Sequence, residues 1–288
     1  MPSIANNPDE KLAKPAASAA WTDENLSNPH EQKDKRQRVQ NMFAAIAPSY
    51  DLNNRLHSFW QDQRWRKKAV KLAGLQASDQ VVDVACGTGD LAWAFAKNLY
   101  NMRAESYLAR DRRAEYPVPN GQITGIDFTF EMLPIAQRKL RSRYPLPPLT
   151  RACRWVNGDA QSLPLPDQCA DVVSIAFGIR NVQDPAVALK EFHRILKPYG
   201  RVIILEFSLP TNPILRALYN FYFRQVLPRT ATWISGDKTG AYKYLPRSVN
   251  TFIGRQQMMT MMRDAGFDRV EQFAMTFGVC VCYRGYKT

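Results

Sequence analysis

The 288-residue sequence has few of the residues that build metal sites or disulfide frameworks. Its three histidines lie far apart and its five cysteines show no C-x-x-C spacing, although protein zinc sites use such ligands at short, regular intervals. Cys280 and Cys282 lie two residues apart in a predicted strand. They therefore share one face, which favours packing over redox chemistry. We expect free thiols and no bound metal.

The sequence also lacks a long apolar segment. No run approaches the roughly 18 apolar residues that a membrane-spanning helix needs. The N-terminal region carries acidic residues, among them Asp9 and Glu10, so it resembles neither a signal peptide nor an acid-poor transit peptide. We therefore expect a protein that is made and kept in the cytoplasm. Its 45% of hydrophobic and 23% of charged residues are typical of a globular protein with one large core.

Acidic residues are in the minority, since 39 Lys and Arg against 26 Asp and Glu give a net charge of +13. Such a charge attracts nucleic acids or anionic membranes, although a simply solvated basic surface is the alternative. The basic residues are not gathered in one block but form separate segments: Lys33–Arg38, Arg64–Lys68, Arg103–Arg113 and Arg138–Arg143. This distribution favours a general surface attraction over the reading of bases, and we expect no nucleic-acid partner.

The first 35 residues differ in composition from the rest of the chain. They are rich in Ala, Asn, Pro and charged residues, with Trp21 and Leu26 as isolated apolar side chains. Segments of this kind bury too little apolar surface to fold alone. We therefore predict a disordered or loosely docked tail over residues 1–35 and one domain over residues 36–288.

The domain begins with a predicted helical cap. Apolar residues at helical spacing over residues 36–76, interrupted at Tyr50–Asn54, indicate helices ahead of the first strand. Strands and helices then alternate, with strands at 81–86, 122–127, 153–157, 170–177 and 201–207, and helices at 89–99, 130–141 and 185–196. Such alternation is typical of a mostly parallel sheet covered by helices on both faces.

Two regions depart from this alternation. Residues 100–121 carry arginines and prolines without a clear period, so we interpret them as an insertion. After Phe207 we predict an aromatic-rich segment at 214–227, a loop with Pro228 and Gly236, a helix at 254–265, and strands at 268–275 and 278–284. The Gly278 turn between the last two strands predicts a C-terminal antiparallel hairpin, which brings the sheet to seven strands.

The most informative segment is Val81–Asp90, where Gly87 and Gly89 break an apolar run and a helical pattern follows. Glycine lacks a Cβ, so the backbone can approach a ligand closely, and the helix N-terminus presents unpaired N–H groups to it. Gly87-x-Gly89-x-x-Ala92 also satisfies the dinucleotide-binding pattern. The turn alone therefore predicts only a nucleotide-type cofactor.

Three carboxylates at successive strands narrow the choice of cofactor. Asp83 lies inside the first strand, where a ligand ammonium group or loop amides could satisfy it. Asp127 ends the second strand and can accept both hydroxyls of a ribose. Asp159, beside the Ala160 N–H, could accept from an adenine amino group. Together these groups indicate S-adenosylmethionine, and the alternative is that the carboxylates only cap helices and turns.

Further motifs between Arg36 and Lys287 carry a resemblance to a known family: Tyr50–Asn54, Phe177–Val182, Arg194–Arg201, Leu205–Ser208 and Arg284–Lys287. The sequence resembles the class I S-adenosylmethionine-dependent methyltransferases. More closely, it resembles the quinone-biosynthesis C-methyltransferases, which methylate demethylmenaquinol and 2-polyprenyl-6-methoxy-benzoquinol. The resemblance implies a Rossmann-like α/β fold and places four residues at cofactor-contacting positions: Thr88, Asp127, Asp159 and Ala160.

The chain departs from the family pattern at several positions. Trp60 replaces a small residue, Asp62 a histidine, and Cys86 and Tyr199 each a glycine, while Asp159 and Ala176 stand where asparagine and serine are frequent. None of these changes removes a group that the chemistry plainly needs.

Transfer of a methyl group to a ring carbon requires an electron-rich ring, which a hydroquinone becomes when its hydroxyl proton is removed or shared. Arg180, just beyond the fourth strand, is a permanent cation that could stabilise the resulting oxyanion. Asn181 could orient the ring oxygen, and Tyr50 could pass a proton or close the pocket, with a relayed water as base. The alternatives are a structural salt bridge for Arg180 and simple packing for Tyr50.

A polyprenylated quinol has a tail that lies in a membrane, so the enzyme must meet it at the membrane surface. The aromatic segment 214–227 and the basic surface suit such peripheral contact, although the aromatic residues could equally be core or a homodimer contact. The sequence leaves open whether the quinol is a naphthoquinol or a benzoquinol. The competing functions are methylation of another small molecule, RNA methylation, and nicotinamide-dependent redox chemistry.

Overall fold

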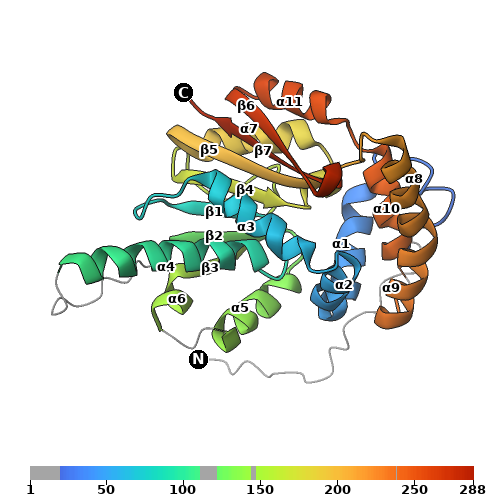
Figure 1. Cartoon of the computed structure of the whole chain (residues 1–288), viewed down its shortest axis with the longest axis horizontal. Helices are drawn as coiled ribbons and strands as arrows, with labels where there is room; N and C mark the ends of the chain where they lie inside the picture. Colours follow the sequence, from blue (N-terminus) through green and yellow to red (C-terminus); the bar gives the residue numbers. More distant parts are fainter. Residues whose placement is uncertain (1–19, 111–121, 144–146, 238) are drawn as a thin grey trace, which may run out of the picture.

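The computed structural model describes residues 20–110, 122–143, 147–237 and 239–288 (Figure 1). Its centre is a seven-stranded sheet with the strand order β3-β2-β1-β4-β5-β7-β6. The strands are β1 (Val81–Val84), β2 (Ile123–Asp127), β3 (Cys153–Asn157), β4 (Ala170–Ala176), β5 (Leu196–Phe207), β6 (Asp268–Met275) and β7 (Cys280–Tyr286). The first five strands pair in parallel, whereas β7 is antiparallel to both β5 and β6. The predicted mostly parallel sheet with a C-terminal antiparallel hairpin is confirmed.

The strand order reverses between β1 and β4, which are neighbours in the centre of the sheet. All four residues of β1 are buried, because the strand is covered on both faces and paired on both edges. Connections that leave a parallel sheet on opposite sides of such a point open a crevice at the carboxyl ends of the strands. The fold therefore places its natural ligand site beyond Val84 and Ala176.

Helices cover both faces of the sheet. The described helical segments are α1 (Lys35–Ile46), η2 (Ala47–Ser49), α2 (Tyr50–His57), α3 (Gln61–Ala73), α4 (Asp90–Arg110), α5 (Met132–Arg143), α6 (Pro147–Ala152), η3 (Ile179–Asn181), α7 (Pro185–Ile195), α8 (Pro213–Phe221), η4 (Tyr222–Val226), α9 (Leu227–Ser235), α10 (Ala241–Thr251), α11 (Arg255–Asp264) and η5 (Thr276–Gly278). Apolar residues of α7 and α11 pack on one face, and those of α3 and α4 on the other. Cys280 and Cys282 point into this second core and are fully buried, so they contribute packing.

A third apolar cluster joins α1 to α8, α9 and α10 beside the sheet (Figure 1). Trp21 and Leu26, which we assigned to a loosely docked tail, belong to this cluster and are 4% and 3% exposed. The Trp21 amide donates to the Thr239 carbonyl over 2.9 Å. Residues 20–34, which we call the N-terminal strap, thus pack on the domain, while residues 1–19 lie outside the described residues. Where the tail ends and the domain begins stays a prediction.

Other segments differ from the predicted elements. Helix α4 does not end near residue 99 but continues to Arg110, so the predicted insertion begins as helix, and residues 111–121 lie outside the described part of the chain. The predicted loop at Pro228 is wrong, because proline is compatible with the first turn of a helix and here is the second residue of α9. Helix α10 was also missed, since its internal Pro246 is typical of a helix break.

Candidate functional site

The turn between β1 and α4 forms the floor of a cavity. Gly87 has a φ of +53°, and a Cβ added there would meet no atom closer than Tyr50 Cε1 at 4.0 Å, so the space above this residue is open. Gly89 has a different role, because a Cβ there would lie 2.6 Å from the Trp155 ring. The first glycine therefore leaves room for a ligand, whereas the second allows close packing.

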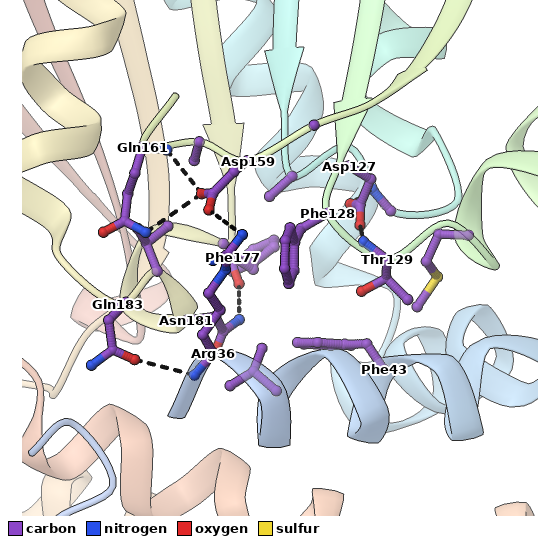
Figure 2. Close-up of a pocket in the computed structure, with 18 of the residues that line it drawn as sticks. Arg36, Phe43, Asp127, Phe128, Thr129, Asp159, Gln161, Phe177, Asn181 and Gln183 are labelled. Atoms are coloured by element: carbon purple, nitrogen blue, oxygen red, sulfur yellow. Dashed lines mark hydrogen bonds and ion pairs between the residues drawn. The ribbon is translucent and has the colours of Figure 1, made fainter. Parts of the chain in front are cut away.

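Cavity A lies at the carboxyl ends of β1, β2 and β4 and is covered by helix α1 (Figure 2). Six of the predicted site residues line it: Tyr50, Gly87, Asp127, Asp159, Ala160 and Asn181. They come from distant parts of the sequence and meet because parallel strands end at the same edge of the sheet. Figure 2 shows Asp127 and Asp159 on opposite sides of this space, with Phe43 of α1 beneath it.

Asp127 connects the two strand ends that border cavity A. Its Oδ2 accepts from the Gly87 amide at 2.7 Å and its Oδ1 from the Thr129 amide at 2.8 Å. Burial raises the pKa of Asp127 to about 6, although both amide hydrogen bonds act in the opposite direction. Each carboxylate oxygen has a second lone pair, so Asp127 can still accept hydroxyl groups from a ligand.

Asp159 carries contacts that the sequence did not predict. Its Oδ1 accepts from the Gln161 amide at 3.0 Å, and its Oδ2 forms an ion pair with Arg36 Nη2 at 3.0 Å. The Arg36 guanidinium also lies 4.5 Å from the centroid of the Phe128 ring, and Figure 2 shows Arg36 reaching into the cavity from α1. Phe128 directly follows Asp127 in the sequence, which was the available signal for it; no sequence signal pointed to Arg36.

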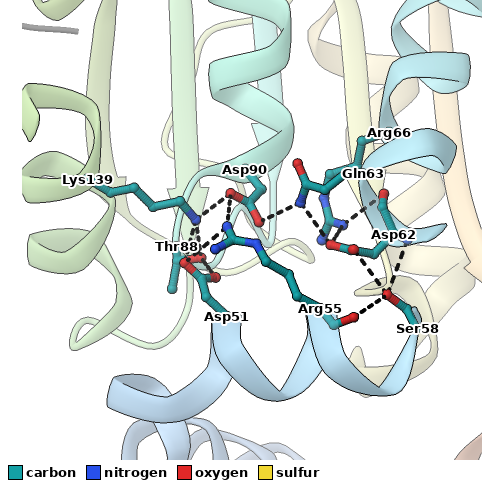
Figure 3. Close-up of polar contacts among 9 residues, drawn as sticks. All are labelled: Asp51, Arg55, Ser58, Asp62, Gln63, Arg66, Thr88, Asp90 and Lys139. Carbon is teal, nitrogen blue, oxygen red and sulfur yellow. Dashed lines mark hydrogen bonds and ion pairs between the residues drawn. The ribbon is translucent and has the colours of Figure 1, made fainter. Parts of the chain in front are cut away.

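Thr88 does not line cavity A but ties the glycine turn to the helical cap. Its hydroxyl donates to Asp51 Oδ1 at 2.5 Å, and Lys139 Nζ lies 2.6 Å from the other oxygen of Asp51. Lys139 also pairs with Asp90 at the start of α4 (Figure 3). This network joins α2, α4 and α5 and fixes the turn from the side that faces away from cavity A.

Asp83 also lies away from the cavity wall, inside β1. Its Oδ1 accepts from the Ser174 hydroxyl at 2.6 Å, while its Oδ2 has no hydrogen-bond partner among the described residues. Burial raises the pKa of Asp83 to about 7. The cofactor contacts predicted for Asp83, Thr88 and Gly89 stay predictions, because none of the three borders cavity A.

A second, aromatic cavity, cavity B, adjoins the first. The two share three lining residues, Phe43, Tyr50 and Phe177, and cavity B extends between α2, α3 and α10. Tyr50 therefore stands at the junction. Burial raises the pKa of Tyr50, so its phenol stays protonated near neutral pH and can donate a hydrogen bond to a ligand.

Arg180 and Asn181 face different cavities, although they are adjacent in η3. Arg180 lines cavity B and its Nη1 lies 2.6 Å from Glu206 Oε1, in an ion pair that is almost fully buried. The same nitrogen donates to the Phe177 carbonyl at 2.7 Å. The structural salt bridge considered for Arg180 is thus present, and Glu206, part of the Leu205–Ser208 motif, neutralises its charge.

Asp62, which stands where the resembling family has histidine, also lines cavity B. Its Oδ2 accepts from Arg66 Nη1 at 2.9 Å and from Gln63 Nε2 at 2.8 Å, and the Ser58 hydroxyl donates to its Oδ1 at 3.0 Å (Figure 3). Donors from three neighbouring side chains thus already surround the carboxylate. Asp62 therefore serves to hold Arg66 at the wall of cavity B.

Comparison with known proteins places this geometry in a family. Residues 31–287 match the model of the ubiE/COQ5 methyltransferase family. The chain is 39% identical over 257 residues to the ubiquinone/menaquinone biosynthesis C-methyltransferase of Citrifermentans bemidjiense, covering 88% of this chain and 98% of that protein. It is 41% identical over 244 residues to the demethylmenaquinone methyltransferase of Thermus thermophilus, covering 85% and 99%.

The fold is shared more widely than the sequence. A crystal structure of an S-adenosylmethionine-dependent methyltransferase from Thermotoga maritima aligns with a TM-score of 0.54 at 20% identity, covering 87% of this chain and all of that one. Such a likeness concerns the fold alone, because one fold serves many reactions. The match over residues 31–287 and the identities of about 40% carry the stronger statement: this chain belongs to the ubiE/COQ5 methyltransferase family.

Proposed function

We propose that this chain is a C-methyltransferase that methylates the ring of a polyprenylated quinol in quinone biosynthesis, with S-adenosylmethionine as the methyl donor. The names of the two relatives support this proposal, since one is a ubiquinone/menaquinone biosynthesis C-methyltransferase and the other a demethylmenaquinone methyltransferase. The observation that carries it is the junction of cavities A and B at Tyr50. A cofactor in one cavity and a flat aromatic acceptor in the other would meet there.

The residues of cavity A fit S-adenosylmethionine. Asp127 retains lone pairs for the ribose hydroxyls, and Asp159 with the Ala160 amide offers an acceptor and a donor to an adenine edge. Gly87 leaves open space for the part of the cofactor nearest the turn. When bound, S-adenosylmethionine supplies an electrophilic methyl group on its sulfonium.

The residues around the junction suit a hydroquinone acceptor. The protonated Tyr50 phenol can donate to a ring oxygen, and the Asn181 amide can orient that oxygen from cavity A. The Arg180–Glu206 pair adds a fixed dipole instead of a free positive charge. To stabilise an oxyanion on the acceptor, as proposed, the Arg180 guanidinium would donate a further hydrogen bond while it stays paired with Glu206.

A methyl-transfer assay tests this function. The purified protein is incubated with labelled S-adenosylmethionine and with each reduced demethylated quinone in turn. We expect label in the naphthoquinol, the benzoquinol or both. If the cofactor binds but neither quinol accepts the label, the quinol assignment fails and another small molecule must be the acceptor. A filter-binding assay with RNA tests the less favoured alternative.

We further propose that the enzyme works in the cytoplasm and docks at the inner face of the cytoplasmic membrane. Ile214, Leu218 and Phe221 lie along one face of α8 and are 71%, 61% and 65% exposed. Phe59 and Trp60, next to Ser58 of cavity B, are exposed as well. We call these five residues the apolar face. Among the described residues, no helix is long and apolar enough to cross a membrane, so contact would be peripheral.

A further inference from the structure

The side-chain amide of Asn181 is held from both ends. Its Nδ2 donates to the Phe177 carbonyl at 3.1 Å, and its Oδ1 accepts from the Tyr244 hydroxyl at 3.0 Å. An asparagine amide has two N–H donors and two acceptor lone pairs, so one donor and one lone pair remain for a ligand. The two bonds decide which end of the amide faces the acceptor, because a flipped amide would set its oxygen against the Phe177 carbonyl oxygen and lose the hydrogen bond that Tyr244 donates to Oδ1.

Tyr244 is built to be a fixed donor. Its side chain is only 1% exposed, and burial raises the pKa of the phenol, so the hydroxyl keeps its proton throughout the working pH range. Its ring stacks on the indole of Trp21, with centroids 4.5 Å apart and planes inclined by 29°. Trp21 belongs to the N-terminal strap, so this strap supports the hydroxyl that orients Asn181.

The strap and the start of α1 also hold the backbone next to Asn181. The buried Lys35 donates from Nζ to the Val182 carbonyl at 2.5 Å. The Arg36 amide donates to Gln183 Oε1 at 3.1 Å, and Gln183 Nε2 donates to the Gln32 carbonyl at 3.3 Å. Backbone and side chains of the Val182–Gln183 segment are thus tied to residues that precede this segment by 147 to 151 positions in the sequence.

We propose that Tyr244, supported by Trp21, is a positioning residue that sets the orientation of the Asn181 amide toward the methyl acceptor. The inference rests on the proposed function, in which Asn181 orients the ring oxygen. Tyr244 also lines cavity B, but in this role its hydroxyl is bonded to Asn181 Oδ1 and acts through that amide. Misplacement of an orienting group by a fraction of an ångström to one ångström lowers rates strongly even when binding survives.

Tyr244→Phe and a matched control, Tyr219→Phe, test the proposal. Both tyrosines are buried in the third apolar cluster, and Tyr219 stacks on Phe223 at 4.1 Å. The Tyr219 hydroxyl has no hydrogen-bond partner among the described residues. Tyr244→Phe is expected to lower kcat for methyl transfer by about 10- to 100-fold and to leave the Kd of S-adenosylmethionine unchanged, whereas Tyr219→Phe keeps wild-type kcat. Trp21→Phe, which retains a smaller ring, should lie between them.

Two further measurements make the test specific. In an Asn181→Ala background, Tyr244→Phe should cause no additional loss, because residues that act as a unit are not additive. In protein labelled with ¹⁵N-asparagine, the Asn181 side-chain NH₂ resonances should shift or broaden in Tyr244→Phe and stay unchanged in Tyr219→Phe. Unchanged resonances, or an equal loss of kcat in the presence and absence of Asn181, overturn the inference. The NMR readout needs no acceptor, so a wild-type enzyme that methylates no quinol overturns only the proposed function.

Discussion

Asp83 is a carboxyl group buried in the middle of the sheet, and it should make stability depend on pH. Its folded-state pKa of about 7 lies above the value of about 3.9 for an exposed Asp. Between about pH 4 and about pH 7 the folded protein therefore binds a proton that the unfolded chain has released. The contribution of Asp83 to the free energy of unfolding is lost as the pH rises through this range. Asp127, with a pKa of about 6, acts in the same direction.

The variant Asp83→Asn isolates this contribution, since the amide oxygen can still accept from Ser174. We expect its melting temperature to fall less than that of the wild type between pH 5 and pH 8. Burial lowers the pKa of His30 to about 4, so His30 changes stability with pH in the opposite direction. This effect is the same in both proteins, so it cancels when their melting temperatures are compared. Asp264→Asn, at an exposed position, is the control and should follow the wild type. Parallel melting curves for Asp83→Asn and the wild type would contradict the prediction.

The Arg180–Glu206 ion pair should matter for stability as well as for activity. Removing one member of a buried pair leaves an uncompensated charge and costs about 3–5 kcal/mol, so Arg180→Ala should lower the free energy of unfolding by about that amount. Arg180→Met combined with Glu206→Leu removes both charges and should cost less. Urea denaturation of Arg180→Met, Glu206→Leu and the double variant gives the coupling energy. A double variant as unstable as the sum of the single variants would show that the pair is not coupled.

The sequence predicted single site residues where strand ends position them. Gly87, Asp127 and Asp159 lie at or within three residues of the carboxyl ends of parallel strands, so the sheet alone brings them together. The sequence could not predict that Glu206 neutralises Arg180, because this ion pair depends on the register between β4 and β5. Nor could it predict the contact of Arg36 with Asp159, which depends on how α1 lies across the cavity.

At the scale of elements, the packing of the N-terminal strap on the domain is the largest difference from the prediction, and Trp21 anchors the strap. Truncation of a buried aromatic side chain costs about 3–5 kcal/mol, so Trp21→Ala should lower the free energy of unfolding by an amount in that range. The matched control is Trp233→Ala on α9, where the side chain is 86% exposed and the expected change is within about 0.5 kcal/mol. Urea denaturation measures both. Equal effects of the two substitutions would mean that the strap does not stabilise the domain.

Elements were predicted best where a continuous apolar run forms a buried parallel strand. The run that begins at Val81 and the one that ends at Ala176 are such cases. The error at α9 has the opposite cause, since Pro228 was assigned to a loop although α9 is stabilised by packing in the third cluster, as is the unpredicted α10. The early start of β5 at Leu196 was missed because Tyr199, with a φ of +64°, occupies a conformation more typical of glycine.

At the scale of the whole molecule, the net charge and the apolar face together indicate which anionic partner the protein binds. A net charge of +13 attracts any polyanion, so it does not by itself favour a membrane over a nucleic acid. Exposed apolar side chains change the balance, because they gain free energy from a lipid interface and none from a phosphate backbone. Arg216 lies on α8 with three residues of this face, and Arg224 lies on η4, which follows α8 directly. Both arginines suit an anionic lipid surface.

Vesicle co-sedimentation tests the membrane contact. The wild type should bind anionic vesicles at low salt, and more weakly at 1 M salt, where charges are screened beyond about 3 Å. Replacing Ile214, Leu218 and Phe221 with Ser should weaken binding at both salt concentrations, because it removes the apolar part. Tyr199→Ser is the control, since Tyr199 is also exposed but lies at the opposite end of β5 from the cavities. Absence of wild-type binding at low salt would exclude the membrane role, and a change of oligomeric state in the triple variant would instead identify this face as a contact between two copies of the chain.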